Sequence, residues 1–153
     1  KNKFKIISNL PYNISSKFLL KILKLDNNCV EVLCMIQKEL AEKFDYSIGK
    51  MNKYKFLTQY CSEYKQKFSI SPNVFKPRPK VNSKMVLFKI KNNNINLNRM
   101  NFFLKYFFIN KRKIIKSNKY FRNLDKKFLN SRYEDLSFEE ILFIYKTFKF
   151  SIS

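Results

Sequence analysis

Apolar and polar residues follow two periods along the first 44 residues, and the period switches three times. Short apolar runs at residues 3–8 and 30–36 are rich in β-branched residues and predict buried strands. Each run is followed by apolar positions at helical spacing, which predict helices over residues 17–25 and 37–44. A strand–helix–strand–helix order is typical of a parallel sheet covered by helices.

The middle of the chain changes from a helical to an alternating pattern. After a loop around Gly49, the spacing predicts a helix over residues 53–64. Residues 66–71 and 84–90 alternate and predict two strands, which we expect to be antiparallel to each other. Residues 72–83 hold three of the four prolines and therefore predict a stiff, extended loop.

The last third of the chain is predicted to be helical. A polar linker at residues 92–98 suggests two units, an α/β part at 1–91 and a small helical subdomain at 98–153. A capping box begins at Ser137 and predicts the start of the last helix, with an apolar face at Phe138, Ile141, Leu142, Tyr145 and Phe148. The first helix of this part is predicted from a stripe of apolar residues at Met100, Phe103, Leu104, Phe107 and Phe108.

The composition adds a strong positive charge. Thirty-two basic and 11 acidic residues give a net charge of +21, which points to a polyanion, and nucleic acid is favoured over a membrane surface. Part of the Lys, Asn, Ile, Phe and Tyr enrichment is also what an AT-rich genome produces. The absence of histidine excludes Ser-His and Cys-His hydrolases. Three cysteines without a C-x-x-C motif argue against a metal site and favour buried thiols in a reducing compartment.

The candidate chemistry lies at residues 9–12, Asn-Leu-Pro-Tyr, between the first predicted strand and helix. An exocyclic amine of a nucleobase is a poor nucleophile, because its lone pair is delocalised into the ring. The amide oxygen of Asn9 and a backbone carbonyl beside the proline could accept its two N–H bonds, and Tyr12 offers a face for stacking. Ser15 or Ser16 is the expected helix N-cap. On these four residues alone, an ordinary strand-to-helix turn explains the pattern equally well.

Four segments in one order carry a family resemblance. They are Asn9–Ser16, Met35–Glu42, Leu57–Tyr60 and Phe75–Ser83. Together they closely resemble the ribosomal RNA adenine dimethyltransferase family of the KsgA type, over most of residues 3–90 and more loosely over the helical tail. The related Erm-type enzymes, which methylate 23S rRNA, share the first and last motifs, whereas the two middle motifs are more similar to the KsgA type.

The resemblance implies a Rossmann-like class I methyltransferase domain of the α/β class with a small C-terminal helical subdomain. It implies transfer of two methyl groups from S-adenosylmethionine to N6 of each of two adjacent adenines in small-subunit rRNA, during ribosome assembly. The family's N-terminal cofactor half, with its glycine-rich turn and ribose-binding acidic residue, has no counterpart here. We therefore expect the C-terminal portion of such an enzyme, inactive alone.

The resemblance also implies site residues. Asn9, Leu10, Pro11 and Tyr12 form the catalytic motif, in which Asn9 and the Leu10–Pro11 backbone hold the amine. Asn9 and Pro11 also border S-adenosylmethionine, and Phe75 closes the other face of a base stacked on Tyr12. The alternative for Phe75 is a hydrophobic plug under a loop. The residues expected to contact RNA are Lys80, Lys111, Arg112, Lys113 and Lys116, for which a solvated surface is the alternative.

The expected partner is small-subunit rRNA or the pre-ribosomal small subunit, bound by a monomer without metal or membrane. The bacterial character of the motifs and the AT-rich composition together suggest an organelle, plastid or mitochondrion, of a eukaryote, with a bacterial cytoplasm as the alternative. A catalytically inactive paralogue that binds rRNA in ribosome assembly, or serves as a ribosomal component, is the competing function.

Overall fold

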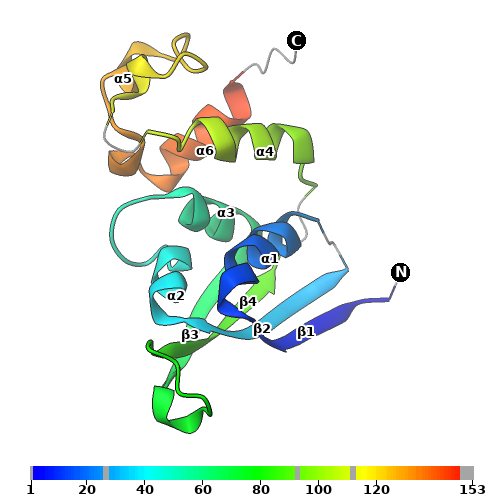
Figure 1. The fold of residues 1–153 in the computed structure, drawn as a ribbon. Helices are drawn as coiled ribbons and strands as arrows, with labels where there is room; N and C mark the ends of the chain where they lie inside the picture. Colours follow the sequence, from blue (N-terminus) through cyan, green and yellow to red (C-terminus); the bar gives the residue numbers. More distant parts are fainter. Residues whose placement is uncertain (1, 26–27, 92–93, 111–112, 149–153) are drawn as a thin grey trace.

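A four-stranded sheet forms the base of the molecule in the computed structural model, which describes residues 2–25, 28–91, 94–110 and 113–148 (Figure 1). Its strands are β1 (Phe4–Asn9), β2 (Cys29–Gln37), β3 (Ser62–Ile70) and β4 (Ser83–Ile90), in the order β1-β2-β4-β3. β1 and β2 are parallel, and β4 is antiparallel to both of its neighbours. The predicted parallel pair and the predicted antiparallel pair are both confirmed.

Three helices cover one face of this sheet (Figure 1). They are α1 (Tyr12–Leu25), α2 (Lys38–Phe44) and α3 (Lys53–Cys61). Alternate residues of β2, namely Val32, Cys34 and Ile36, are fully buried, as the period of two along a strand requires. β1 lies at the edge of the sheet, and its Ile7 is 79% exposed. The prediction that β1 is a buried strand is therefore wrong.

The start of α1 differs from the prediction. The helix begins at Tyr12 and not at Lys17, so neither Ser15 nor Ser16 is its N-cap. Pro11 stands just ahead of the first turn, where its missing N–H costs nothing and its fixed φ suits the helix. Ser15 is buried, and its hydroxyl donates a 2.7 Å hydrogen bond back to the Pro11 carbonyl, four residues earlier.

The boundary between α3 and β3 also differs. The helix predicted to reach residue 64 ends at Cys61, and β3 begins at Ser62 instead of Gln66. Tyr64 is held on the strand by partners distant in sequence. Its ring lies 5.0 Å from that of Phe88, and its hydroxyl donates to the Ala41 carbonyl at 2.8 Å. Local spacing carries no information on such contacts, which override helix propensity.

The C-terminal part contains α4 (Leu97–Tyr106), α5 (Lys126–Leu129) and α6 (Phe138–Thr147). All five residues of the expected apolar stripe are buried, although Phe107 and Phe108 lie just beyond the end of α4. The capping box of α6 is confirmed. The prediction that the last third is helical is wrong for residues 113–125, which form turns and one short 3-10 segment. Lys111 and Arg112 lie outside the described residues. Short 3-10 turns occur at Pro72–Val74, Ile115–Ser117 and Tyr133–Asp135.

One aromatic core joins α3 to the C-terminal helices. Phe56 of α3 is fully buried, and four rings of the C-terminal part lie within 5.4–6.1 Å of it. These rings belong to Phe103, Phe108, Phe138 and Tyr145. Arg99 of α4 donates to the backbone carbonyls of Tyr145, Lys146 and Phe148 at the end of α6. A cation at a helix C-terminus is stabilising, so Arg99 fastens α4 to α6.

The three thiols are buried, as expected, and their burial should slow their reaction with alkylating reagents. Burial raises the pKa of Cys34, and likewise that of Cys61, to about 12. At pH 8.5 such a thiol is roughly 3 parts in 10,000 thiolate, against roughly half for an ordinary thiol. We expect iodoacetamide to alkylate Cys34 and Cys61 at least about 100-fold more slowly in the folded protein than in urea. Equal rates in both states, measured by mass spectrometry, would contradict this burial.

Candidate functional site

The end of β1 brings residues 9–12 to the carboxyl edge of the parallel strands. Asn9 pairs with Met35 of β2, and the Leu10 N–H donates to the Met35 carbonyl at 3.3 Å. The chain then leaves the sheet at Pro11 and enters α1 at Tyr12. Ligands of open α/β sheets bind at this kind of edge, beyond the carboxyl ends of the strands.

The carbonyls of Leu10 and Pro11 differ in their availability. The Pro11 carbonyl accepts the N–H groups of Ile14 and Ser15 at 3.2 and 3.1 Å, and the Ser15 hydroxyl at 2.7 Å. The Leu10 carbonyl lies farther from the Ser15 hydroxyl, at 3.4 Å. Because a hydroxyl has a single proton to donate, the shorter contact takes it. The Pro11 carbonyl is therefore saturated with donors, whereas the contact to the carbonyl of the buried Leu10 is the weaker one.

Tyr12 is held in place by a residue that was assigned no role in the sequence analysis. Its phenol oxygen lies 2.7 Å from the Ser83 hydroxyl, within hydrogen-bonding distance. Ser83 is fully buried at the start of β4, where it pairs with Gln37 and Ile70. The bond joins two residues 71 positions apart and holds the Tyr12 ring from its polar end. The one sequence signal for it was the position of Ser83 at the end of the Phe75–Ser83 motif.

A cavity of about 240 Å³ unites the predicted motif with the proline-rich loop. Asn9, Leu10, Pro11 and Tyr12 line it together with Phe75, although Phe75 is distant in sequence. The remaining lining residues are Met35, Lys76, Pro77 and Pro79. Phe75 is half-buried and follows the 3-10 turn Pro72–Val74. The cavity thus brings together the exposed Asn9, the Leu10–Pro11 segment and two aromatic residues.

A second cavity of about 240 Å³ contains Lys80, one of the residues expected to contact RNA. It is lined by Gln37, Lys38, Glu39, Lys80, Val81 and Asn82. The Lys38 N–H donates to the Asn82 carbonyl at 2.9 Å and so ties the loop to the start of α2. The other two described basic residues of the prediction, Lys113 and Lys116, are exposed on the C-terminal part and line neither cavity.

Within the described residues, no cluster of three or more His, Cys, Asp or Glu side chains could hold a metal ion. Over the same residues, no helix has both the length and the apolar character needed to cross a bilayer.

Comparisons with known sequences give one consistent result. The family model of ribosomal RNA adenine dimethylase matches residues 1–149. A protein named ribosomal RNA small subunit methyltransferase A from Malacoplasma penetrans is 39% identical over 138 residues, which are 88% of this chain and 48% of that protein. Its namesake from a Hydrogenobaculum species is 32% identical over 148 residues, 94% of this chain and 57% of that protein. The chain spans about half the length of these curated relatives.

Solved structures share the fold. A dimethyladenosine transferase from Plasmodium falciparum superimposes with a TM-score of 0.76 at 19% identity, covering 93% of this chain and 66% of that one. The 23S rRNA methyltransferase ErmE superimposes with a TM-score of 0.69 at 16% identity, covering 95% of this chain and 65% of that one. The predicted class, a Rossmann-like methyltransferase fold of the KsgA and Erm type, is confirmed.

Proposed function

The chain belongs to the ribosomal RNA adenine dimethylase family, and from that premise we propose that it supplies the base-binding part of an rRNA adenine N6-dimethyltransferase. The substrate is two adjacent adenines of small-subunit rRNA, and S-adenosylmethionine is the methyl donor. The observation that carries the proposal is the cavity in which Asn9, the Leu10 carbonyl, Tyr12 and Phe75 meet.

The two acceptors orient the amine of the target adenine. The Asn9 amide oxygen and the Leu10 carbonyl each accept one N–H of N6, so the nitrogen lone pair points out of the plane of the ring. An amine held in this way is a better nucleophile because conjugation with the ring is reduced. Alignment of the reacting atoms is the main requirement for the transfer. The chain therefore needs no general base in contact with N6, whose proton leaves after the methyl group has been transferred.

The two aromatic side chains hold the base itself. Tyr12 stacks on one face of the adenine and Phe75 closes the other, which is how enzymes that flip bases out of a helix secure them. Stacking of one base on an aromatic side chain is worth about 1–3 kcal/mol. The rings also exclude water from N6, which strengthens the hydrogen bonds to Asn9 and Leu10.

We assign S-adenosylmethionine a place at the edge of this cavity. S-adenosylmethionine supplies an electrophilic methyl group when bound, and Asn9 and Pro11 are the residues assigned to face it. Both are exposed and line the cavity, so a molecule next to the base can reach them. The single glycine, Gly49, lies in the loop between α2 and α3, and we assign it no contact with the cofactor.

A methylation assay tests the function. The full-length protein is incubated with S-adenosylmethionine and with small ribosomal subunits that lack the modification, and the nucleosides of the rRNA are then analysed by mass spectrometry. We expect N6,N6-dimethyladenosine at two adjacent positions. Tight, salt-dependent binding to the subunit without any methylation would contradict the proposal and favour the inactive rRNA-binding paralogue.

Removal of the Ser83 hydroxyl should leave the Tyr12 ring in the cavity but hold it less firmly in position. Ser83→Ala deletes one hydrogen bond, worth about 1 kcal/mol, so we expect kcat to fall by roughly five- to tenfold. Tyr12→Phe deletes the same bond from the other side and should have a similar effect. Because the two variants remove one interaction, the double variant should be little worse than either single one. Additive losses in the double variant would show that the bond does not position the ring.

A further inference from the structure

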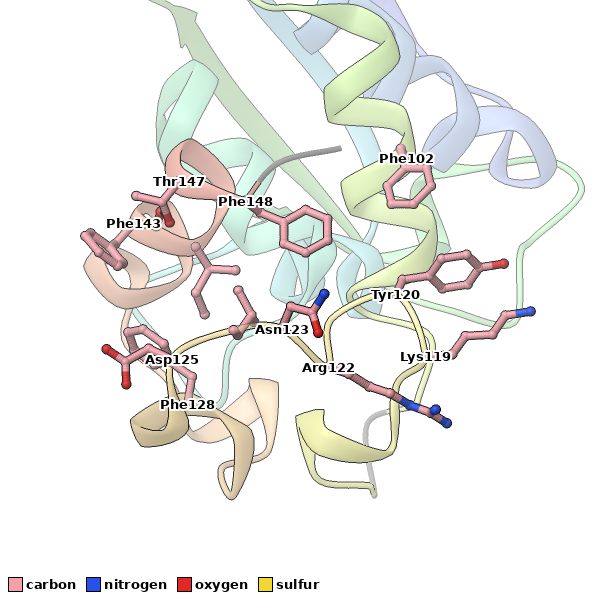
Figure 2. A pocket seen from close by; sticks show the side chains of 12 residues that line it. Phe102, Lys119, Tyr120, Arg122, Asn123, Asp125, Phe128, Phe143, Thr147 and Phe148 are labelled. Atoms are coloured by element: carbon pink, nitrogen blue, oxygen red, sulfur yellow. The ribbon is translucent and has the colours of Figure 1, made fainter. Parts of the chain in front are cut away.

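The C-terminal part contains a larger cavity, which the proposed reaction does not use. Its volume is about 720 Å³, within the usual range of roughly 300–1,000 Å³ for ligand sites. It lies between α4, the turns at residues 119–125 and α6 (Figure 2). It shares no lining residue with the cavity around Asn9, so it is a separate site.

Five aromatic side chains line this cavity. They are Phe102, Tyr120, Phe128, Phe143 and Phe148. The rings of Phe102 and Tyr120 are 5.5 Å apart, and those of Phe128 and Phe143 are 6.1 Å apart. Figure 2 shows these two pairs on opposite sides of the cavity, with Asn123 between them. Phe143 is 51% exposed although it belongs to α6, so its ring offers a free face to a ligand.

The rim of this cavity is positively charged. Lys119 and Arg122 line it, and both are exposed. The Lys127 ammonium lies 4.6 Å from the ring centre of Phe128 and 5.4 Å from that of Phe143. Asp125 is the one acidic residue among those that line the cavity. It is the N-cap of α5, and its carboxylate accepts the backbone N–H of Lys127 at 3.1 Å.

We propose that this cavity binds an unpaired nucleotide of RNA. The base stacks on Phe143 beside Phe128, and the Lys127 ammonium next to both rings neutralises a flanking phosphate. Lys119 and Arg122, which lie toward Tyr120 in Figure 2, neutralise phosphates farther along the strand. The Asn123 carboxamide and the Thr147 hydroxyl supply polar groups for the base edge. Aromatic rings next to a basic track are the usual composition of sites for single-stranded nucleic acid. The inference rests on the proposed function, because it adds a second contact to the same rRNA substrate.

RNA is favoured over a protein ligand by charge. Three cations, Lys119, Arg122 and Lys127, border the aromatic surface, against the carboxylate of Asp125, so the net charge there is positive. The whole chain carries +21, so a polyanion gains from counterion release wherever it meets such a surface.

Two substitutions in the full-length protein separate stacking from charge. The probe is a fluorescein-labelled single-stranded RNA hexamer, and its Kd is measured by anisotropy over a range of salt concentrations. We expect Phe143→Ala to raise the Kd about five- to tenfold without changing the slope of log K against log[salt], since no charge is lost. Arg122→Gln should lower that slope by about 1. Phe143→Tyr should restore binding, and Phe68→Ala, at a 60% exposed phenylalanine of β3, is the matched control.

Photo-crosslinking locates the base. A hexamer containing 5-iodouridine should crosslink to Phe143, Tyr120 or Phe128, as read by mass spectrometry of the peptides. The inference is overturned if Phe143→Ala binds the hexamer as the Phe68→Ala control does, or if every crosslink maps elsewhere. If the cavity binds a protein partner instead, Phe143→Ala should bind the hexamer like the control and the crosslinks should map elsewhere, so that outcome also overturns the inference.

Failure of this inference is distinguishable from failure of the proposed function. If the enzyme methylates rRNA but Phe143→Ala changes neither RNA affinity nor the KM for the small subunit, only the inference fails. If the hexamer binds at Phe143 but rRNA is never methylated, the proposed function fails and the nucleotide site stands.

Discussion

Replacement of Asn9 by alanine is expected to lower kcat for rRNA methylation by about 100- to 1,000-fold. The amide oxygen of Asn9 accepts one N–H of the target amine in the proposed complex, and one such hydrogen bond to the reacting group is typically worth about 3–4 kcal/mol in the transition state. Asn9 is exposed at the end of β1, and its side chain fills no part of the core. The folded state should therefore tolerate the change.

Single-turnover methyl transfer to small ribosomal subunits, followed with labelled S-adenosylmethionine, measures this effect. Asn13→Ala is the matched control, because Asn13 is also exposed and lies only four residues away in α1. The control should retain nearly all activity. An Asn9→Ala enzyme as fast as the control would refute the assigned role of the amide. A rise in KM with unchanged kcat would show that Asn9 binds the base without orienting its amine.

Phe56→Ala should have the largest effect on stability. The ring is fully buried, and it is surrounded by Phe103, Phe108, Phe138 and Tyr145 of the C-terminal part. Removal of such a ring costs roughly 3–5 kcal/mol, a large share of the roughly 5–15 kcal/mol that stabilises a typical domain. Because Phe56 connects α3 to α4 and α6, its loss should also weaken the attachment of the C-terminal helices to the sheet.

Urea denaturation of the full-length protein, followed by circular dichroism and by near-ultraviolet absorbance, tests this prediction. Phe68→Ala removes the same atoms from a side chain that is 60% exposed, and we expect a change within about 0.5 kcal/mol. A Phe56→Ala protein as stable as that control would mean that the cluster rearranges to fill the space. It would also mean that the C-terminal helices are held mainly by other contacts, such as the Arg99 hydrogen bonds.

Local patterns predicted the elements whose stability is local. The stripe of α4 and the capping box at Ser137 both follow from spacing and from residues a few positions apart. The position of Asn9–Tyr12 between a strand and a helix was likewise predictable, because the apolar period changes on either side of it, although the helix starts five residues earlier than predicted. The roles proposed for these residues stay predictions until they are tested.

Contacts between distant segments account for what the sequence did not reveal. The bond between Tyr12 and Ser83, and the strand position of Tyr64, each depend on a partner that no local spacing can specify. The C-terminal cavity is a similar case: Tyr120 and Phe143 come from a turn and from a helix, and only the tertiary fold places them around one space. Two of the residues predicted to contact RNA, Lys113 and Lys116, lie in turns, although this part of the chain was predicted to be helical.

The three hydrogen bonds received by the Pro11 carbonyl have a consequence for the entropy of binding. A segment that is disordered before it meets its ligand loses about 1–2 kcal/mol per residue when its backbone is fixed. Residues 9–12 are already fixed by β2 on one side and by the first turn of α1 on the other. Across the cavity, Pro77 and Pro79 restrict the segment around Phe75 before any ligand arrives. Both walls therefore meet an incoming base in a preset shape, so most of the conformational entropy lost on binding should come from the RNA.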